Sequence, residues 1–132
     1  MERDFTGVRV LVTEDNPLNR EILQYILEDM GMSVENACDG KEAVDKFTAS
    51  EKGYYDLIIM DIMMPVMNGY EAAKMIRSLD RKDAKVVPII AMTANAFTED
   101  RIRAKEAGMD EHVAKPVDVE LLIKVIHKLV ND

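Results

Sequence analysis

Short runs of β-branched and other apolar residues alternate along this chain with longer amphipathic stretches, and this alternation limits its fold more than any other feature. The short runs cover residues 8–12, 33–37, 57–60, 88–92 and 111–114. Most are followed by a stretch with helical spacing of apolar residues, as in βαβ units with parallel strands. We therefore predict an α/β fold: a doubly wound five-stranded parallel sheet, strand order 2-1-3-4-5, with five helices.

Capping residues mark where these helices begin and end. Asn16 and Pro17 supply an N-cap and a first-turn proline for the first helix, and Gly31 closes it. Apolar residues at every fourth position of this helix, with Leu23 and Leu27 beside them, predict one stripe packed on the sheet: Leu18, Ile22, Ile26 and Met30. A second helix is expected after Asp39-Gly40, through Ala43, Val44 and Phe47, and a third after Asn68-Gly69. A fourth is expected over 98–107, where Gly108 ends it. The last helix is expected from Asp118, with apolar residues at Val119, Leu122, Ile126 and Leu129.

Size and charge narrow the classes of function. A chain of 132 residues fits one domain, so we expect a single domain over residues 1–132 and no output domain. The formal charge of −8 disfavours direct binding to nucleic acid or to an anionic membrane surface. Apolar runs fall well short of the roughly 20 residues that span a bilayer. The single cysteine, Cys38, fits a reducing compartment, so a cytoplasmic location is expected.

Polar residues stand at the carboxyl ends of four of the five predicted strands. Glu14 and Asp15 follow the first strand, Asp61 the third, Thr93 the fourth and Lys115 the fifth. Ligands of open parallel sheets bind beyond these strand ends, where the strand order reverses. Three carboxylates in one crevice require a cation, and oxygen donors without His or Cys favour magnesium. The sequence therefore predicts a magnesium site at this edge of the sheet.

The same residues suit phosphoryl chemistry. A magnesium ion held by one or two carboxylates keeps positions open for phosphate, and Lys115 adds a mobile positive charge. Thr93 offers a hydroxyl donor, and the small Ala94 after it leaves the backbone open to approach. Asp61 is the central candidate for a nucleophile toward phosphorus. Taken singly, Asp15 could cap a helix, Thr93 could end a strand and Lys115 could be a surface lysine; only the combination favours a site.

These residues lie in four segments that closely resemble the receiver domain of two-component response regulators, the flavodoxin-like module typified by the chemotaxis response regulator. The segments are Glu14-Asp15, residues 60–69 (MDIMMPVMNG), residues 91–94 (AMTA) and Lys115-Pro116. Each alone is weak evidence, but all four occur in order, and the match covers essentially the whole chain. Residues 64–69 and 94–96 also resemble receivers of hybrid sensor kinases, so the chain could be such a domain excised.

The resemblance implies that Asp61 accepts a phosphoryl group from a histidine kinase or a histidine phosphotransfer protein. Asp15, Asp61 and the main-chain carbonyl of Met63 would ligate magnesium, with Glu14 acting mainly through a bound water. Manganese could substitute for magnesium. Lys115 would pair with the phosphoryl group. The domain would then be a phosphoacceptor that catalyses its own phosphorylation and dephosphorylation, and no further enzyme activity is expected.

The resemblance also implies positions for switching and for tuning. Thr93 would swing toward the phosphoryl group, coupled to the residue three before the lysine, where His112 replaces the family's commoner Tyr or Phe. Histidine is smaller than Tyr or Phe and is titratable, so the strength of the coupling between Thr93 and His112 stays open. Met63 and Asn95 would flank the path of an attacking water and tune dephosphorylation, with no lifetime predicted. The peptide bond before Pro116 is a candidate for the cis form.

An output partner, unknown from the sequence, would read the phosphorylated state as a shift between two conformations. The face expected to contact it combines the helix over 98–107, the strand over 111–114 and the last helix from Asp118. Phosphorylation could also promote a homodimer.

Two other classes of function stay open. A phosphatase or phosphotransferase with an aspartyl-phosphate intermediate would use the same aspartate, magnesium and lysine. Enzymes of the haloacid dehalogenase type carry a second aspartate two residues after the nucleophile, where this chain has Met63. A scaffold with receiver shape but without phosphorylation would usually have lost part of the acidic pocket, which is intact here. The phosphoacceptor is the leading hypothesis.

Overall fold

The computed structural model describes residues 4–94 and 98–130 and confirms the predicted fold class. Its five strands pair in parallel in the order β2-β1-β3-β4-β5. Their bounds are β1 (Arg9–Thr13), β2 (Ser33–Ala37), β3 (Leu57–Asp61), β4 (Ile89–Thr93) and β5 (Glu111–Ala114). The strand order reverses between β1 and β3, so a crevice opens beyond their carboxyl ends.

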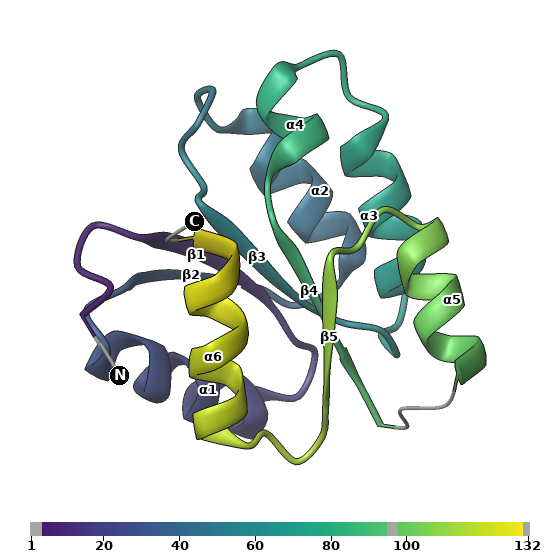
Figure 1. Ribbon diagram of the computed structural model, residues 1–132. Helices are drawn as coiled ribbons and strands as arrows, with labels where there is room; N and C mark the ends of the chain where they lie inside the picture. Colours follow the sequence, from purple (N-terminus) through teal and green to yellow (C-terminus); the bar gives the residue numbers. More distant parts are fainter. Residues whose placement is uncertain (1–3, 95–97, 131–132) are drawn as a thin grey trace.

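Helices cover both faces of this sheet (Figure 1). Their bounds are α1 (Pro17–Asp29), α2 (Gly40–Ala49), α3 (Gly69–Arg77), α4 (Lys82–Val86), α5 (Thr98–Glu106) and α6 (Val119–Val130). The five longer helices are the predicted ones, whereas the prediction of five in total missed α4. This helix has five residues and no side-chain N-cap, so it is too short to show an apolar period in the sequence.

The core has two layers, one on each face of the sheet. Helices α1 and α6 pack with Val10, Val12 and Ile59 on one face. Helices α2, α3, α4 and α5 pack with Leu11 and Ile58 on the other. Because both faces are covered, β3 and β4 are buried at every position, as their unbroken apolar runs predict.

Two strands lie one residue later in the chain than predicted. The first strand runs over Arg9–Thr13 instead of 8–12, and the fourth over Ile89–Thr93 instead of 88–92. Thr13 pairs with Ala37 of β2, and β-branched threonine suits a strand. The third strand likewise extends by one residue to Asp61. As a result, Asp61 and Thr93 stand on rigid sheet positions and not on loops.

The predicted apolar stripe of α1 is only half buried. Met30, at the C-cap, is buried together with Leu23 and Leu27, but Leu18 is 63% exposed and Ile22 is 51% exposed. At 3.6 residues per turn, each step of four residues rotates by about 40° around the helix, so a row at this spacing leaves the buried face. The N-terminal half of α1 therefore presents apolar side chains outside the core.

Candidate functional site

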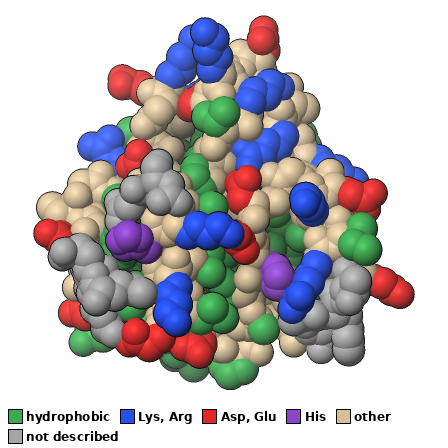
Figure 2. All heavy atoms as spheres, viewed as in Figure 1, with side chains coloured by type: hydrophobic (Ala, Val, Ile, Leu, Met, Phe, Trp, Pro, Cys, Tyr) green, Lys and Arg blue, Asp and Glu red, His purple; other side chains and the backbone are tan. Residues whose placement is uncertain are grey.

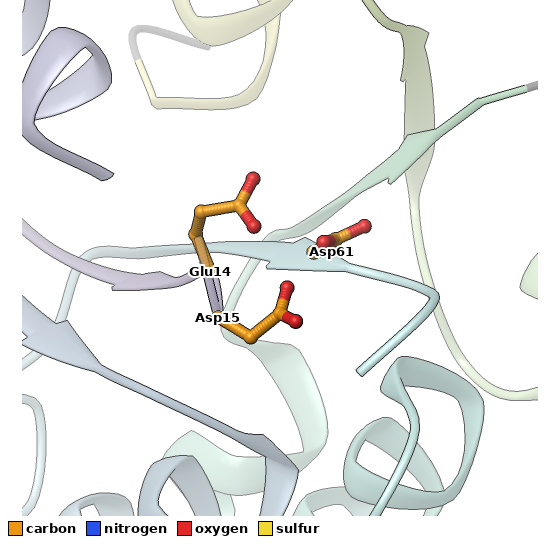
Figure 3. A group of neighbouring side chains, drawn as sticks. All are labelled: Glu14, Asp15 and Asp61. Atoms are coloured by element: carbon orange, nitrogen blue, oxygen red, sulfur yellow. The ribbon is translucent and has the colours of Figure 1, made fainter. Parts of the chain in front are cut away.

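Three carboxylates meet at the carboxyl ends of β1 and β3 (Figure 3). Glu14 and Asp15 follow β1 directly, and Asp61 is the last residue of β3. One carboxylate oxygen from each residue lies within 4.8 Å of the others. Glu14 and Asp61 are buried and Asp15 is exposed, so the group opens to solvent on one side. The structure thus brings together the acidic residues that the sequence singled out.

Glu14 is held firmly although it carries a buried charge. Its N–H donates to the Ala37 carbonyl at 3.1 Å, and its carbonyl accepts from Arg20 Nη1 at 2.8 Å. The Oε2 atom accepts from the Asn16 N–H at 3.1 Å, whereas the buried Oε1 accepts no well-aligned hydrogen bond from the described residues and has the Lys115 Nζ 3.2 Å away. A buried carboxylate charge needs a cation nearby, so Oε1 suits the Lys115 ammonium group as observed and a metal ion or its bound water in its place.

Lys115 reaches into the same crevice from the end of β5. Its Nζ lies 2.9 Å from Asp61 Oδ2 and 3.2 Å from Glu14 Oε1. Burial alone would lower the pKa of Lys115, but the hydrogen bond to Asp61 and the negative charges of Asp61 and Glu14 outweigh burial and raise that pKa above its ordinary value. Lys115 therefore stays charged through neutral pH, and its contribution to stability is lost only as pH rises through the folded-state pKa.

The charges and donor atoms of the crevice fit magnesium. Three carboxylates and one lysine leave a formal charge of −3 + 1 = −2. All side-chain donors are oxygens, with no His or Cys among the grouped residues, which suits a hard divalent cation. The side chain of Met63 is 75% exposed, and its main-chain carbonyl stays a predicted ligand. Glu14, Asp15 and Asp61 are the residues that would hold the ion.

Thr93 ends the neighbouring strand β4 with an unused hydroxyl. The residue is 5% exposed, and its Oγ1 has no hydrogen-bond partner among the described residues. Its carbonyl accepts the Lys115 N–H at 2.8 Å, which ties the ends of β4 and β5 together. Ala94 follows as an exposed residue. The Lys115–Pro116 peptide bond, a predicted candidate for the cis form, is cis.

Two predicted positions remain. His112 lies away from the acidic group, and Asn95 is not among the residues that the structure describes. His112 is half-buried on β5 opposite Ala91 and borders a cavity of about 290 Å³ that Arg101 and Lys105 of α5 also line. Its side chain therefore faces α5 from β5.

A groove beside the acidic group was not predicted from the sequence. Its cavity of about 450 Å³ is bordered by Glu14 and Lys115 and is lined mostly by apolar residues of α1, β4 and the segment after β5: Ile22, Leu23, Ile26, Met92, Pro116 and Val117. The apolar spacing of α1 indicated an apolar surface on this helix, but the prediction placed the whole stripe in the core and none of it in a groove. The exposed Leu18 and Tyr25 lie on the same helix.

The surface carries charges of both signs. Figure 2 shows Lys and Arg side chains interspersed with Asp and Glu on one face of the molecule, with hydrophobic side chains visible between them. Among the helices described within residues 4–94 and 98–130, none is both long enough and apolar enough to cross a membrane.

Magnesium should stabilise the folded chain, because only the folded state gathers the three carboxylates. At 100 times its dissociation constant, a ligand that binds only the folded state adds about 2.7 kcal/mol to the free energy of unfolding. We expect Asp15→Asn to lose most of this gain in urea unfolding with magnesium or EDTA. The matched control is Asp45→Asn, which removes an exposed carboxylate that pairs only with Lys41 in the described contacts. An equal magnesium gain in wild type and Asp15→Asn would contradict the site.

Comparison with known proteins agrees with this geometry. A family profile for the response regulator receiver domain matches residues 10–127. The chain is 39% identical over 121 residues to hybrid signal transduction histidine kinase I of Dictyostelium discoideum, a match that covers 90% of this chain and 7% of that kinase. The chain therefore belongs to the response regulator receiver domain family, and it spans less than a tenth of this curated relative.

Two solved structures are similar over nearly the whole chain. One is the receiver domain of a sensor histidine kinase from Pseudomonas aeruginosa with a magnesium ion coordinated in its active site cleft (TM-score 0.85, 35% identity, 96% of this chain and 100% of that chain). The other is the Saccharomyces cerevisiae complex of a histidine phosphotransfer signaling protein with the receiver domain of its downstream response regulator (TM-score 0.84, 32% identity, 96% of this chain and 91% of that chain).

Proposed function

We propose that this chain is a phosphorelay receiver that accepts a phosphoryl group on Asp61. The observation that carries the proposal is the position of the Asp61 carboxylate, which is 3% exposed, beside the acidic pair and 2.9 Å from Lys115 Nζ. An Asp61 carboxylate oxygen attacks the phosphorus of a phosphohistidine. The new P–O bond forms as the P–N bond breaks, and the imidazole leaves and takes up a proton. The product is an acyl phosphate on Asp61.

The residues around Asp61 have separate roles in this transfer. Magnesium, when bound, would neutralise charge between the carboxylates and the incoming phosphoryl group, and manganese would do the same. Lys115, now paired with Asp61 and Glu14, turns to the phosphoryl oxygens. Thr93 donates its unpartnered buried hydroxyl to a phosphoryl oxygen, with the small Ala94 leaving room beside it. Gaining this partner favours a position of Thr93 closer to Asp61.

The conformational output is proposed to pass from Thr93 through β4 and β5 to the face formed by α5, β5 and α6. His112 lies on that route, half-buried next to α5. Among the described side chains of α5, only Ala104 is buried in the core, and Ile102 is 54% exposed. A weakly held helix shifts at low cost in free energy. An output partner or a second copy of the chain would read this shift.

Dephosphorylation is proposed to be the domain's own reaction, with water attacking the acyl phosphate in the same crevice. Met63 and Asn95 flank that path in the family, and the apolar Met63 side chain cannot orient a water by hydrogen bonding.

The free thiol Cys38 supports a cytoplasmic location, where thiols stay reduced.

The intact mass of the protein after incubation with acetyl phosphate tests the proposal. We expect one added phosphoryl group in the presence of magnesium and none with EDTA. Turnover of a phosphate ester with no lasting adduct would instead favour the phosphatase class. The absence of any adduct with acetyl phosphate and with a panel of phosphorylated donors would favour the scaffold.

The phosphodonor is proposed to dock in the groove between α1 and the segment after β5. The groove borders Glu14 and Lys115, so a helix laid in it brings a histidine to Asp61. Its apolar lining and the exposed Leu18, Ile22 and Tyr25 suit the apolar face of a partner helix.

We expect Ile22→Asp to slow transfer from a histidine phosphotransfer protein by about 10-fold or more, because apolar contact is replaced by a charge. Phosphorylation by acetyl phosphate should be unchanged, since that donor needs no docking. Radiolabel transfer measures both rates. The control is Val86→Asp, which changes an apolar residue outside the groove that is 76% exposed, against 51% for Ile22. Equal slowing by the two variants would place the donor elsewhere.

A further inference from the structure

The loop between β3 and α3 carries Met63, the predicted main-chain ligand of magnesium. Its base is closed by the Gly69 N–H, which donates to the Ile62 carbonyl at 2.9 Å. Within it, the Met67 N–H donates to the Pro65 carbonyl at 2.7 Å. Val66 has φ of 69°, a left-handed conformation that β-branched residues rarely adopt. Contacts outside the loop must therefore help to hold its shape.

Gly40, the first residue of α2, makes such a contact. Its N–H donates to the Met67 carbonyl at 3.2 Å, and the residue is buried. A Cβ added to Gly40 would lie 2.4 Å from the Met67 carbonyl oxygen and 3.0 Å from the carbonyl carbon. Gly40 does not have a left-handed φ, so the position requires glycine for space alone. The Asp39 side chain caps α2 by accepting the Glu42 N–H at 2.8 Å, which closes the first turn of the helix that Gly40 begins.

We infer that Gly40 is a positioning residue for the magnesium site. Because it has no Cβ, the first turn of α2 lies directly against the Met67 carbonyl and sets the position of the loop that carries Met63. This inference rests on the proposed function. Magnesium requires near-octahedral geometry at about 2.0–2.1 Å, whereas calcium accepts flexible geometry at about 2.3–2.6 Å. A small shift of the loop should therefore disfavour magnesium more than calcium.

Gly40→Ala tests the inference. Alanine suits the first turn of a helix better than glycine, so the main cost is the contact with Met67. Cβ atoms essentially never approach closer than 3.0 Å, so the two backbones must separate by at least 3.0 − 2.4 = 0.6 Å. We expect the magnesium dissociation constant to rise about 10-fold or more, in the range seen when outer-shell groups are removed. Calcium affinity should change by less than about 3-fold, with both measured by isothermal titration calorimetry.

A matched variant separates this effect from a weaker α2. Ala43→Gly is the reverse change three residues further along the same helix, where Ala43 is fully buried. It destabilises α2 without adding an atom against the loop, so the ratio of magnesium to calcium affinity should stay at the wild-type value. Equal loss of both metals in Gly40→Ala, or the same change of ratio in Ala43→Gly, would overturn the inference. The phosphorylation rate of Gly40→Ala should recover at saturating magnesium.

Amide hydrogen exchange of the wild-type protein gives a second test that does not depend on the folding of a variant. Magnesium should slow exchange of the Gly40 amide, which bonds to the loop, more than exchange of the Ser50 amide, which bonds to Phe47 at the other end of α2. Equal slowing at both amides would overturn the inference. Failure of the wild-type protein to bind magnesium would be a different result, because it would also remove the proposed function.

Discussion

Asp61→Asn is expected to take up no phosphoryl group from any donor. The asparagine amide is uncharged and is a poor nucleophile toward phosphorus. No other carboxylate in the group is both the last residue of β3 and 2.9 Å from Lys115 Nζ. Asp15 is exposed. Glu14 follows a different strand, and its Oε2 atom already accepts the Asn16 N–H. Intact mass after incubation with acetyl phosphate and magnesium measures the loss, which should be complete within detection.

The control for this variant lies on the same strand segment. Asp56 precedes β3 at the opposite end, where its carboxylate accepts the Arg9 N–H at 2.9 Å. Asp56→Asn should be phosphorylated like the wild-type protein, although it weakens that hydrogen bond. A full adduct on Asp61→Asn would assign the acceptor to another residue. Full regulation of a partner by Asp61→Asn without any donor would favour the scaffold.

Lys115→Met is expected to change metal binding and phosphorylation in opposite directions. Lys115 now neutralises part of the carboxylate group, through Asp61 at 2.9 Å and Glu14 at 3.2 Å. Its removal leaves a formal charge of −3 in the crevice instead of −2, so magnesium should bind more tightly. The phosphorylation rate from acetyl phosphate should fall about 100- to 1000-fold, as when other preorganised donors to a transferring group are removed.

Titration of magnesium and the rate of adduct formation check this pair of expectations on one sample. Lys41→Met serves as the control, because Lys41 is exposed and pairs with Asp45 on the surface of α2. A phosphorylation rate within about 3-fold of wild type would remove Lys115 from the transfer step. Weaker magnesium binding would show that its ammonium group does not compete with the ion.

The sequence predicted the fold class well because strand and helix periods are local properties. The apolar run of residues 57–60 favoured a buried strand, and Asn68-Gly69 marked where the next helix begins. The structure adds that Asn68 and Glu71 form a reciprocal capping box at the start of α3. The short helix α4 was missed because one helical turn has no period to detect. The predicted ends of three strands fall one residue short of the observed ends at Thr13, Asp61 and Thr93, because pairing with a neighbouring strand decides where a ladder stops.

By itself, the sequence determined which chemical groups the site contains. A doubly wound sheet gathers the carboxyl ends of its strands at one edge, so Glu14, Asp15, Asp61, Thr93 and Lys115 had to lie near one another once the topology was known. Only the tertiary structure decided how these groups are paired. The pairing of Lys115 with Glu14 and the contact of Gly40 with Met67 join segments that are far apart in the chain. Such contacts follow from packing and not from any local period.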